Sequence, residues 1–512
     1  MATRRQPLIP GWLIPGLLAA ILMVVVSLGA FLALWFNAPE SDLLALWHDS
    51  YLWHVIRFSF WQAFLSALLS AIPAIFLARA LYRRRFPGRL ALLRLCAMTL
   101  ILPVLVAVFG ILSVYGRQGW LASLFNLLGL EWTFSPYGLK GILLAHIFFN
   151  MPMATRLFLQ ALENIPGEQR QIAPVAALIF MLCFASFATV LSLGGGPQAT
   201  TIELAIYQAL SYDYDPGRAA LLAMVQMVCC LALVLLSQRL SKAIPTGSNN
   251  LTGWRDPQDS LHSRIADFML IALALLLLLP PLLAVIVDGL NRNVLSVLQQ
   301  PVLWQATWTS LRIALAAGIL CVILTMMLLW SSRELYARHA RKAAHALELT
   351  GMLILAMPGI VLATGFFLLF NSTIGLPESA DGIVIFTNAL MAIPYALKVL
   401  ENPMRDVNSR YSLLCQSLGM QGWQRLKVVE LRALKRPLAQ ALAFACVLSI
   451  GDFGVVALFG NEDFRTLPFW LYQQIGSYRS QDGAVTALLL LVLCFALFTV
   501  IEKLPGRDVK TD

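Results

Sequence analysis

The sequence predicts an all-α polytopic membrane protein with about twelve transmembrane helices, built as a parallel internal repeat of six helices plus six. Three observations support this fold class. Hydrophobic residues make up 59% of the 512 residues, charged residues make up 12%, and the mean hydropathy is +0.75. A soluble domain is about a quarter charged, so the excess apolar surface must face lipid. The apolar residues gather in span-length windows, and the two halves of the chain share landmarks.

Each transmembrane helix requires about 20 predominantly apolar residues. The clearest window runs from Leu270 to Val287 and is broken only by Pro280 and Pro281. Twelve such windows lie near residues 11–36, 57–80, 92–115, 138–160, 174–195, 217–238, 264–289, 306–331, 348–371, 382–401, 437–460 and 483–502. The first window is too long for the apolar part of a signal peptide, so we expect it to be retained.

The charges in the loops predict the orientation of the chain. Lys and Arg concentrate on the cytoplasmic side of a membrane protein. Basic residues fill the loops after the second, eighth and tenth windows: Arg79, Arg83, Arg84, Arg85, Arg89, Arg333, Arg338, Arg341, Lys342, Arg405, Arg410, Arg425, Lys427, Arg432, Lys435 and Arg436. The alternate loops are neutral or acidic, with Asp42, Asp213 and Glu462 among their residues. We therefore expect both termini in the cytoplasm, and we attribute the net charge of +10 to orientation and not to nucleic-acid binding.

The two halves repeat in the same direction. Gly110 matches Gly365 at an offset of 255, Pro152 matches Pro394 at 242, and Tyr207 matches Tyr472 at 265. The fall of the offset from 255 to 242 predicts a longer outer loop in the first half, between residues 115 and 137. The rise of the offset from 242 to 265 predicts that the first half lacks about 23 residues between its fourth and fifth windows. Residues 402–436 of the second half have only residues 163–173 as their counterpart there. A parallel repeat is a common plan for transporters.

These landmarks divide the chain into five parts. We expect a first helix and periplasmic loop at 1–56, a first repeat at 57–238, a cytoplasmic linker with the seventh helix at 239–305, a second repeat at 306–502 and a cytoplasmic tail at 503–512.

Residue patterns for covalent chemistry or metal binding are missing from the sequence. It has no phosphate-binding G-x-x-x-x-G-K-[ST] motif, and its six histidines are scattered. Seven of the eight cysteines lie in apolar runs, and we place Cys415 in a polar loop. We expect no catalytic residue, no metal and no cofactor, so the chain is predicted not to be an enzyme.

The segment 410–431 predicts a short amphipathic helix that contains Leu413, Leu414, Ser417 and Leu418 and is capped by Gly419. It resembles the coupling loop of type I ABC importer permeases, with Gly419 at the motif's glycine and Arg432 in place of its proline. The acidic residue of the motif is absent. The resemblance implies contact with a cytoplasmic ATPase through Leu414, Gln416, Gly419, Trp423 and Arg425. The alternative is a solvated linker helix.

The second informative segment is 449–454, inside the eleventh window. It resembles the G-[DE]-[FY]-G element of sulfate, molybdate and ferric-iron permeases, with Asp452 and Phe453 as its central pair. A carboxylate inside an apolar span costs about 2.5–3.5 kcal/mol on insertion scales, so it normally faces a cavity or a partner. We place Phe187 at the position of the first half that matches Asp452. A role in a gate or in packing is favoured over direct contact with a cationic substrate.

Over its whole length the chain resembles the permease subunits of bacterial thiamine ABC transporters, most clearly at 184–197, 357–365 and 449–460. The resemblance implies an inner-membrane permease that imports thiamine and its phosphates. Its implied partners are a periplasmic thiamine-binding protein and two cytoplasmic ATPase subunits. The family carries a coupling loop in each half. Here residues 168–172 run almost directly into Pro174, which puts transport by this chain in question.

Two other functions stay open at this point. A fused permease of the ferric-iron or phosphonate type would differ only in its binding protein. A twelve-helix ion-coupled secondary transporter would carry several charges within its spans, whereas Asp452 is essentially the one that we find. A structural or receptor role is a third possibility.

Overall fold

A computed structural model describes residues 10–38, 45, 47–164, 172–240, 259–371, 376–420 and 422–506. Within these residues the regular structure is helical and there is no strand. The shortened loop predicted at 163–173 falls mainly on residues 165–171, which lie outside the described part of the chain.

Ten helical segments of the described residues are long and apolar enough to cross a membrane. They are α1 (Ile14–Asn37), α3 (Ser50–Arg83), α5 with α6 (Val104–Tyr115 and Trp120–Leu127), α7 (Leu139–Asn164), α11 (Pro216–Leu240), α12 (Leu261–Gly289), α14 (Pro301–Ala337), α17 (Leu376–Ser417), α20 with α21 (Lys435–Ile450 and Gly454–Phe459) and α23 (Ser480–Lys503).

Two bent pairs complete the set of spans. The first pair is α8 (Ile172–Phe184) with α9 (Phe187–Leu193), bent by 57°. The second joins α15 (Arg341–Met352) and η3 (Leu353–Ala356) to α16 (Gly359–Asn371), bent by 84°. Counting each pair as one span gives up to 12, the number of predicted windows. The third span is Val104–Leu127, whereas we predicted it at 92–115, because Arg89–Met98 forms a separate short helix.

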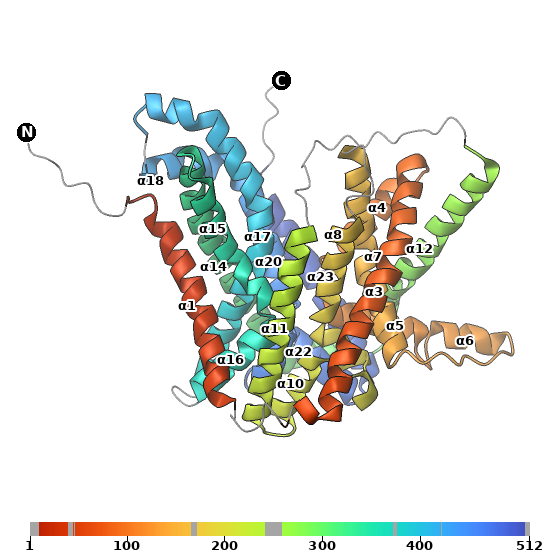
Figure 1. Ribbon diagram of the computed structural model, residues 1–512. Helices are drawn as coiled ribbons and strands as arrows, with labels where there is room; N and C mark the ends of the chain where they lie inside the picture. Colours follow the sequence, from red (N-terminus) through yellow and green to blue (C-terminus); the bar gives the residue numbers. More distant parts are fainter. Residues whose placement is uncertain are drawn as a thin grey trace, which may run out of the picture. The chain divides into compact units, whose positions relative to one another are not determined.

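The remaining helices are short. They are α4 (Arg89–Met98), η2 (Pro197–Ala199), α10 (Ile202–Ser211), α13 (Val294–Leu298), α18 (Gly422–Arg425), the π-helical turn η4 (Leu426–Glu430), α19 (Leu431–Ala433) and α22 (Leu467–Gly476). Helix α6, which belongs to the candidate span with α5, falls within residues 115–137, where we predicted an outer loop. It extends away from the other helices of its unit (Figure 1).

The helices form two compact units. One consists of Met1–Asn37, Gln305–Thr466 and Val492–Asp512, and the other consists of Ala38–Trp304 and Leu467–Leu491. In the first of these units α1 packs on α15 and α16, and in the second α12 packs on α3 and α5 (Figure 1). The first helix of the chain therefore joins the second repeat, and the seventh helix joins the first repeat.

Two repeat-related glycines explain how these crossing helices fit. A Cβ atom on Gly110 of α5 would lie 2.4 Å from the carbonyl oxygen of Pro281 in α12. A Cβ atom on Gly365 of α16 would lie 2.9 Å from the Cα atom of Ala30 in α1. Only glycine permits such close backbone approach between transmembrane helices. The same crossing is thus built in both halves of the chain.

Candidate functional site

The predicted coupling segment is the end of a long helix. Helix α17 runs for 42 residues through Pro394 and Pro403, so the separate short amphipathic helix expected before Gly419 is its last part. Prolines are tolerated inside membrane helices because neighbouring groups can satisfy the freed backbone. The helix ends as expected, since Gly419 has a φ of +63° and the Met420 N–H donates to the Cys415 carbonyl at 2.8 Å.

Four apolar side chains project from the end of this segment. Leu413 is 77% exposed, Leu414 53%, Leu418 64% and Trp423 69%. We call these four residues the coupling surface. Gln416 is exposed beside them. A cluster of exposed large apolar side chains is typical of a surface that contacts a partner. Cys415, placed in a polar loop from the sequence, is instead buried in α17.

Arg425, expected on the ATPase-facing surface, lies inside the protein instead. Its Nε atom is 3.0 Å from Glu430 Oε1, and its Nη2 donates to Asn408 Oδ1 at 2.7 Å. Arg333 of α14 forms an ion pair with the same carboxylate. We call Arg333, Arg425 and Glu430 the ion cluster. Glu430 is 0% exposed, so its charge is neutralised only by these neighbours.

The ion cluster fastens the coupling segment to α14. Glu334 contributes a second carboxylate, with its Oε1 atom 3.7 Å from Arg333 and 3.6 Å from Arg425. Two cations therefore face two anions. Separating buried charges from their partners is strongly unfavourable, so a displacement of the coupling segment should be passed on to α14.

The first repeat lacks this arrangement. Arg79 of α3 occupies the position of Arg333 at an offset of 254, and it is exposed with no ion pair among the described residues. Its neighbours Arg83 and Arg84 instead bind the start of α12. Arg84 Nε lies 2.8 Å from Asp267 Oδ2, and Arg84 Nη2 donates to Asp259 Oδ1 at 2.7 Å. The hydrogen bond from Arg84 holds the pKa of Asp259 well below its usual range.

Asp452 lies at a break in the eleventh span, between α20 and α21. Its carboxylate faces the backbone N–H groups at the start of α21, which belong to Gly454, Val455 and Val456. Its Oδ2 atom has no hydrogen-bond partner among the residues that the structure describes. A carboxylate at a helix N-terminus satisfies otherwise unpaired donors. Asn388 of α17 lies beside it and donates to Ser449 Oγ at 3.0 Å. This capping explains why an apolar span contains the charge, and Phe453 beside it is 2% exposed.

A similar break occurs between α8 and α9 in the first repeat. The break aligns Ser186 with Asp452 and Phe187 with Phe453 at an offset of 266, so Phe187 is one residue away from the match that we expected. His146 Nε2 is 2.9 Å from Ser186 Oγ, and its Nδ1 is 2.8 Å from Ser66 Oγ.

At both breaks a residue of the fourth span lies beside the residue at the break, and these residues occupy matching positions in the two repeats. His146 matches Asn388 at the offset of 242 that also relates Pro152 to Pro394. In each repeat a polar side chain of the fourth span therefore meets the break in the fifth. The six histidines are scattered along the sequence and gave no sign of a role for His146, although the offset of 242 identifies its position.

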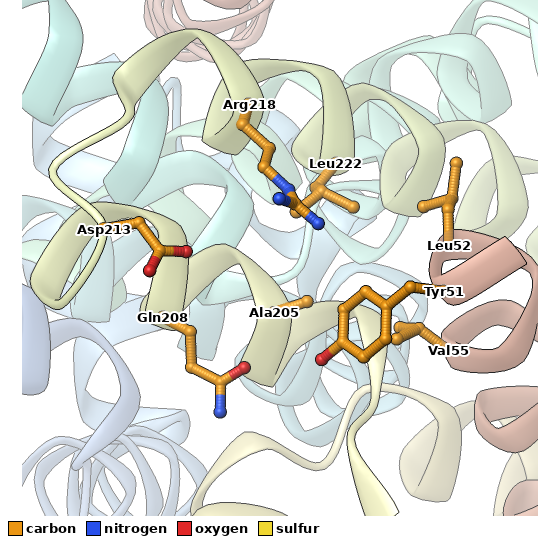
Figure 2. Close-up of a pocket in the computed structure, with 8 residues that line it drawn as sticks. All are labelled: Tyr51, Leu52, Val55, Ala205, Gln208, Asp213, Arg218 and Leu222. Atoms are coloured by element: carbon orange, nitrogen blue, oxygen red, sulfur yellow. The ribbon is translucent and has the colours of Figure 1, made fainter. Parts of the chain in front are cut away.

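A separate cavity of about 230 Å³ opens near the acidic loop that follows α10. Figure 2 shows Tyr51 and Arg218 on one side of it and Gln208 and Asp213 on the other. The Arg218 guanidinium lies 6.0 Å from the centre of the Tyr51 ring and 3.8 Å from the Asp49 carboxylate. None of the residues predicted to be functional lines this cavity.

Comparison with known proteins identifies the family. The chain is 81% identical to the thiamine transport system permease protein of Escherichia coli (strain K12), and the match covers 100% of both chains. This chain belongs to the family of thiamine transport system permease proteins. The Salmonella typhimurium member is 78% identical over 100% of both chains, and the Haemophilus influenzae member is 42% identical over 95% of this chain and 96% of its own.

A broader family description agrees with this assignment. Residues 330–503 match the family described as "Binding-protein-dependent transport system inner membrane component". Membership of this family confirms the prediction of a type I ABC importer permease. The chain is a multi-pass inner-membrane protein and is not itself an enzyme. A permease of this kind works with an ATPase and a periplasmic binding protein. The fused iron-type permease and the ion-coupled transporter are not favoured.

The comparisons also bear on the missing residues. The alignment with the Escherichia coli permease covers 536 positions and the present chain has 512 residues, so 536 minus 512 leaves 24 positions that this chain lacks. The offsets between the repeats predicted about 23. This chain is thus shorter than the Escherichia coli permease by about the number of residues that the offsets predicted.

Proposed function

We propose that this protein imports thiamine and its phosphates across the inner membrane. It would receive them from a periplasmic thiamine-binding protein and use ATP hydrolysis by two cytoplasmic ATPase subunits. The observation that carries this proposal is the 81% identity, over the full length of both chains, to a permease whose name specifies thiamine transport.

The coupling surface supplies the contact with the ATPase. Leu414 and Trp423 present exposed apolar area, and Gln416 adds an exposed amide. Buried apolar and aromatic anchors surrounded by polar groups are typical of protein interfaces. Gly419 shapes this surface by ending α17, and Arg425 supports it from within through the ion cluster.

The complex is proposed to be asymmetric. The second repeat offers one complete coupling surface, whereas the first repeat has only the 11 residues 163–173 as the counterpart of residues 402–436. One ATPase subunit would dock firmly, and the other would be held mainly by its ATPase partner. The orientation follows from the basic loops, with the coupling surface and both termini in the cytoplasm.

Asp452, Phe453 and Phe187 are assigned to gating and packing at the two helix breaks. The capping of Asp452 by backbone N–H groups supports a structural use of this charge. Direct contact of Asp452 with a cationic substrate is the weaker candidate.

Reconstitution tests the proposed function. The permease, a matching ATPase and a thiamine-binding protein would be placed in proteoliposomes with ATP inside, and uptake of radiolabelled thiamine would be measured. Uptake should require ATP and the binding protein, and unlabelled thiamine should compete while a phosphonate or ferric citrate should not. Absence of ATP-dependent thiamine uptake, even after the first coupling loop is restored, would overturn the proposal.

A further inference from the structure

Helix α3 turns polar residues inward and aromatic residues outward over its first half. Ser59 is 1% exposed and Gln62 is 0% exposed. Phe60 is 36% exposed, Trp61 53% and Phe64 51%. These aromatic side chains have no role in the function described so far. In a membrane protein such a face lies against lipid, so its shape and charge determine which lipid it binds best.

The aromatic face of α3 forms one wall of a groove. The groove has a volume of about 680 Å³ and is lined by Ile56, Arg57 and five aromatic side chains, four from α3 and Phe180 from α8. The two helices pack on each other (Figure 1). The centres of the Phe60 and Phe180 rings are 6.1 Å apart. We call this feature the aromatic groove and define it by Arg57, Phe60, Trp61, Phe64 and Phe180.

Arg57 lies at the level where the hydrocarbon of the membrane ends. The 34 residues of α3 span about 50 Å, whereas the hydrocarbon core is about 30 Å thick, so both ends of the helix extend beyond it. The apolar window expected from the sequence begins at residue 57, and Trp47 and Trp53 precede it. Tryptophan is enriched at the membrane interface. The Arg57 guanidinium therefore lies beside the lipid headgroups, and Phe60 and Phe64 lie beside the acyl chains.

Arg57 is available to bind an anion. Its side chain is exposed and forms no ion pair within the part of the chain that the structure describes. The starts of α3 and α14 match at an offset of 251, which places Trp308 of α14 at the position of Arg57. Arg312, one turn further along α14, pairs with Asp381 at 2.6 Å. Of these two arginines, only Arg57 is without an ionic partner among the described residues.

We propose that the aromatic groove binds an anionic phospholipid of the outer leaflet. The phosphate accepts hydrogen bonds from the Arg57 guanidinium, whose fork of N–H donors suits phosphate. An acyl chain lies against the rings of Phe60, Phe64 and Phe180. The site favours an anionic headgroup over a zwitterionic one, because the cation of a zwitterionic headgroup offsets the attraction. The choice of leaflet rests on the orientation proposed above, whereas binding itself does not depend on transport.

Lipid binding by the purified full-length permease tests this site. The protein would be titrated in detergent with phosphatidylglycerol or with phosphatidylcholine of the same acyl chains, and native mass spectrometry would measure the bound lipid. The unaltered protein should bind phosphatidylglycerol about fivefold more tightly, which is the ratio that one arginine near anionic headgroups supplies. Arg57→Gln should reduce this preference to less than about twofold. Phe64→Ala should weaken the binding of both lipids and preserve the preference, because the ring contacts the acyl chain.

Arg292→Gln is the matched control. Arg292 is exposed in the loop after α12, which we place on the same side of the membrane, and it lies outside the groove. Its loss should leave the preference unchanged. The proposal is overturned if the unaltered protein binds both lipids equally, or if Arg57→Gln and Arg292→Gln reduce the preference by the same amount.

Inorganic phosphate separates a lipid site from a simple anion site. At the concentration of the lipid it should not displace phosphatidylglycerol, because it makes no contact with the aromatic side chains. Displacement would identify an anion site that needs no lipid and would also overturn the proposal. No transport is measured in these titrations, so a failure of thiamine import would overturn the proposed function and leave this site intact.

Discussion

Gly110 lies against the backbone carbonyl of Pro281, so close that a methyl group in place of its hydrogen would come within 2.4 Å of the oxygen. The equivalent Gly365 lies against the backbone of Ala30, and the corresponding Cα distance is 2.9 Å. These contacts place α12 on the first repeat and α1 on the second. The exchange of outer helices between the repeats therefore depends on two glycines.

Replacing either glycine should weaken the folded protein. Gly110→Ala should cost about 1–3 kcal/mol because backbone atoms, which cannot rotate away, must shift. Thermal unfolding in detergent would measure the loss, and Gly365→Ala should behave in the same way. Gly29→Ala in α1 is the control, since its Cβ would meet nothing within 4 Å. Equal melting temperatures for Gly110→Ala and Gly29→Ala would contradict this account.

Substitution of Gly419 should uncouple ATP hydrolysis from transport. Its φ of +63° costs a β-branched residue more than the ~1–2 kcal/mol typical of other L-residues, so Gly419→Val should extend or distort the end of α17. Uptake should fall while the amount of inserted protein is unchanged. Gly419→Asn provides the control, because asparagine adopts this conformation more readily. Normal uptake by the valine variant would mean that this turn does not shape the coupling surface.

Breaking the ion cluster should destabilise the coupling segment. Glu430→Gln leaves Arg333 and Arg425 with Glu334 as their remaining carboxylate. This should lower the free energy of unfolding by about 3–5 kcal/mol. Replacing Arg333, Arg425 and Glu430 together by Met, Leu and Leu should recover most of the stability but not the coupling, which uptake per ATP hydrolysed would reveal.

Arg79 supplies the matched control for the ion cluster. It occupies the position of Arg333 in the first repeat but is exposed, so Arg79→Met should change stability by less than about 0.5 kcal/mol. If Arg79→Met and Arg333→Met destabilise the protein equally, the ion cluster has no special role.

The missing coupling loop should limit the response to substrate. Stimulation of ATPase by loaded binding protein should be weak, and insertion of a loop of the 402–436 type after Ile172 should raise it by completing the second docking surface. Purified complexes with and without the insertion would be compared at saturating binding protein. Equal transport by both would show that a single coupling surface suffices.

Reporter fusions would test the orientation. Fusions at Arg84, Arg341 and Lys427 should report the cytoplasm, because basic loops stay on that side. Fusions at Asp42, Asp213 and Glu462 should report the periplasm. Reversed signals at two of these positions would reject the assignment.

Hydropathy located the spans because lipid leaves a backbone few alternatives to the helix. It could not show which helix crosses which, since the contact of Gly365 with Ala30 depends on residues far apart in the sequence. Local pattern also misplaced two features near Gly419. The segment before Gly419 is the end of α17 and not a separate short helix. Arg425 turns inward because it pairs with the buried Glu430, which also pairs with Arg333 of α14, a residue far away in the sequence.

The internal offsets were the more informative signal at the candidate site. They related Tyr207 to Tyr472, and the same offset of 242 that relates Pro152 to Pro394 would also have related His146 to Asn388. They could not reveal that Asp452 is capped by backbone N–H groups, because the break between α20 and α21 depends on the three-dimensional path of the span.

The position of α1 sets a condition on how the protein is made. Ala30 meets Gly365, a residue that leaves the ribosome 335 residues later. At about 5–20 residues per second, this delay lasts roughly 15–70 s. During that interval α1 must wait in the bilayer with its alanine-rich face covered only by lipid or by an insertion factor. A first half made without the second would leave α1 without its neighbour α16. The two repeats are therefore consecutive in the sequence, but each depends on the other to complete its packing.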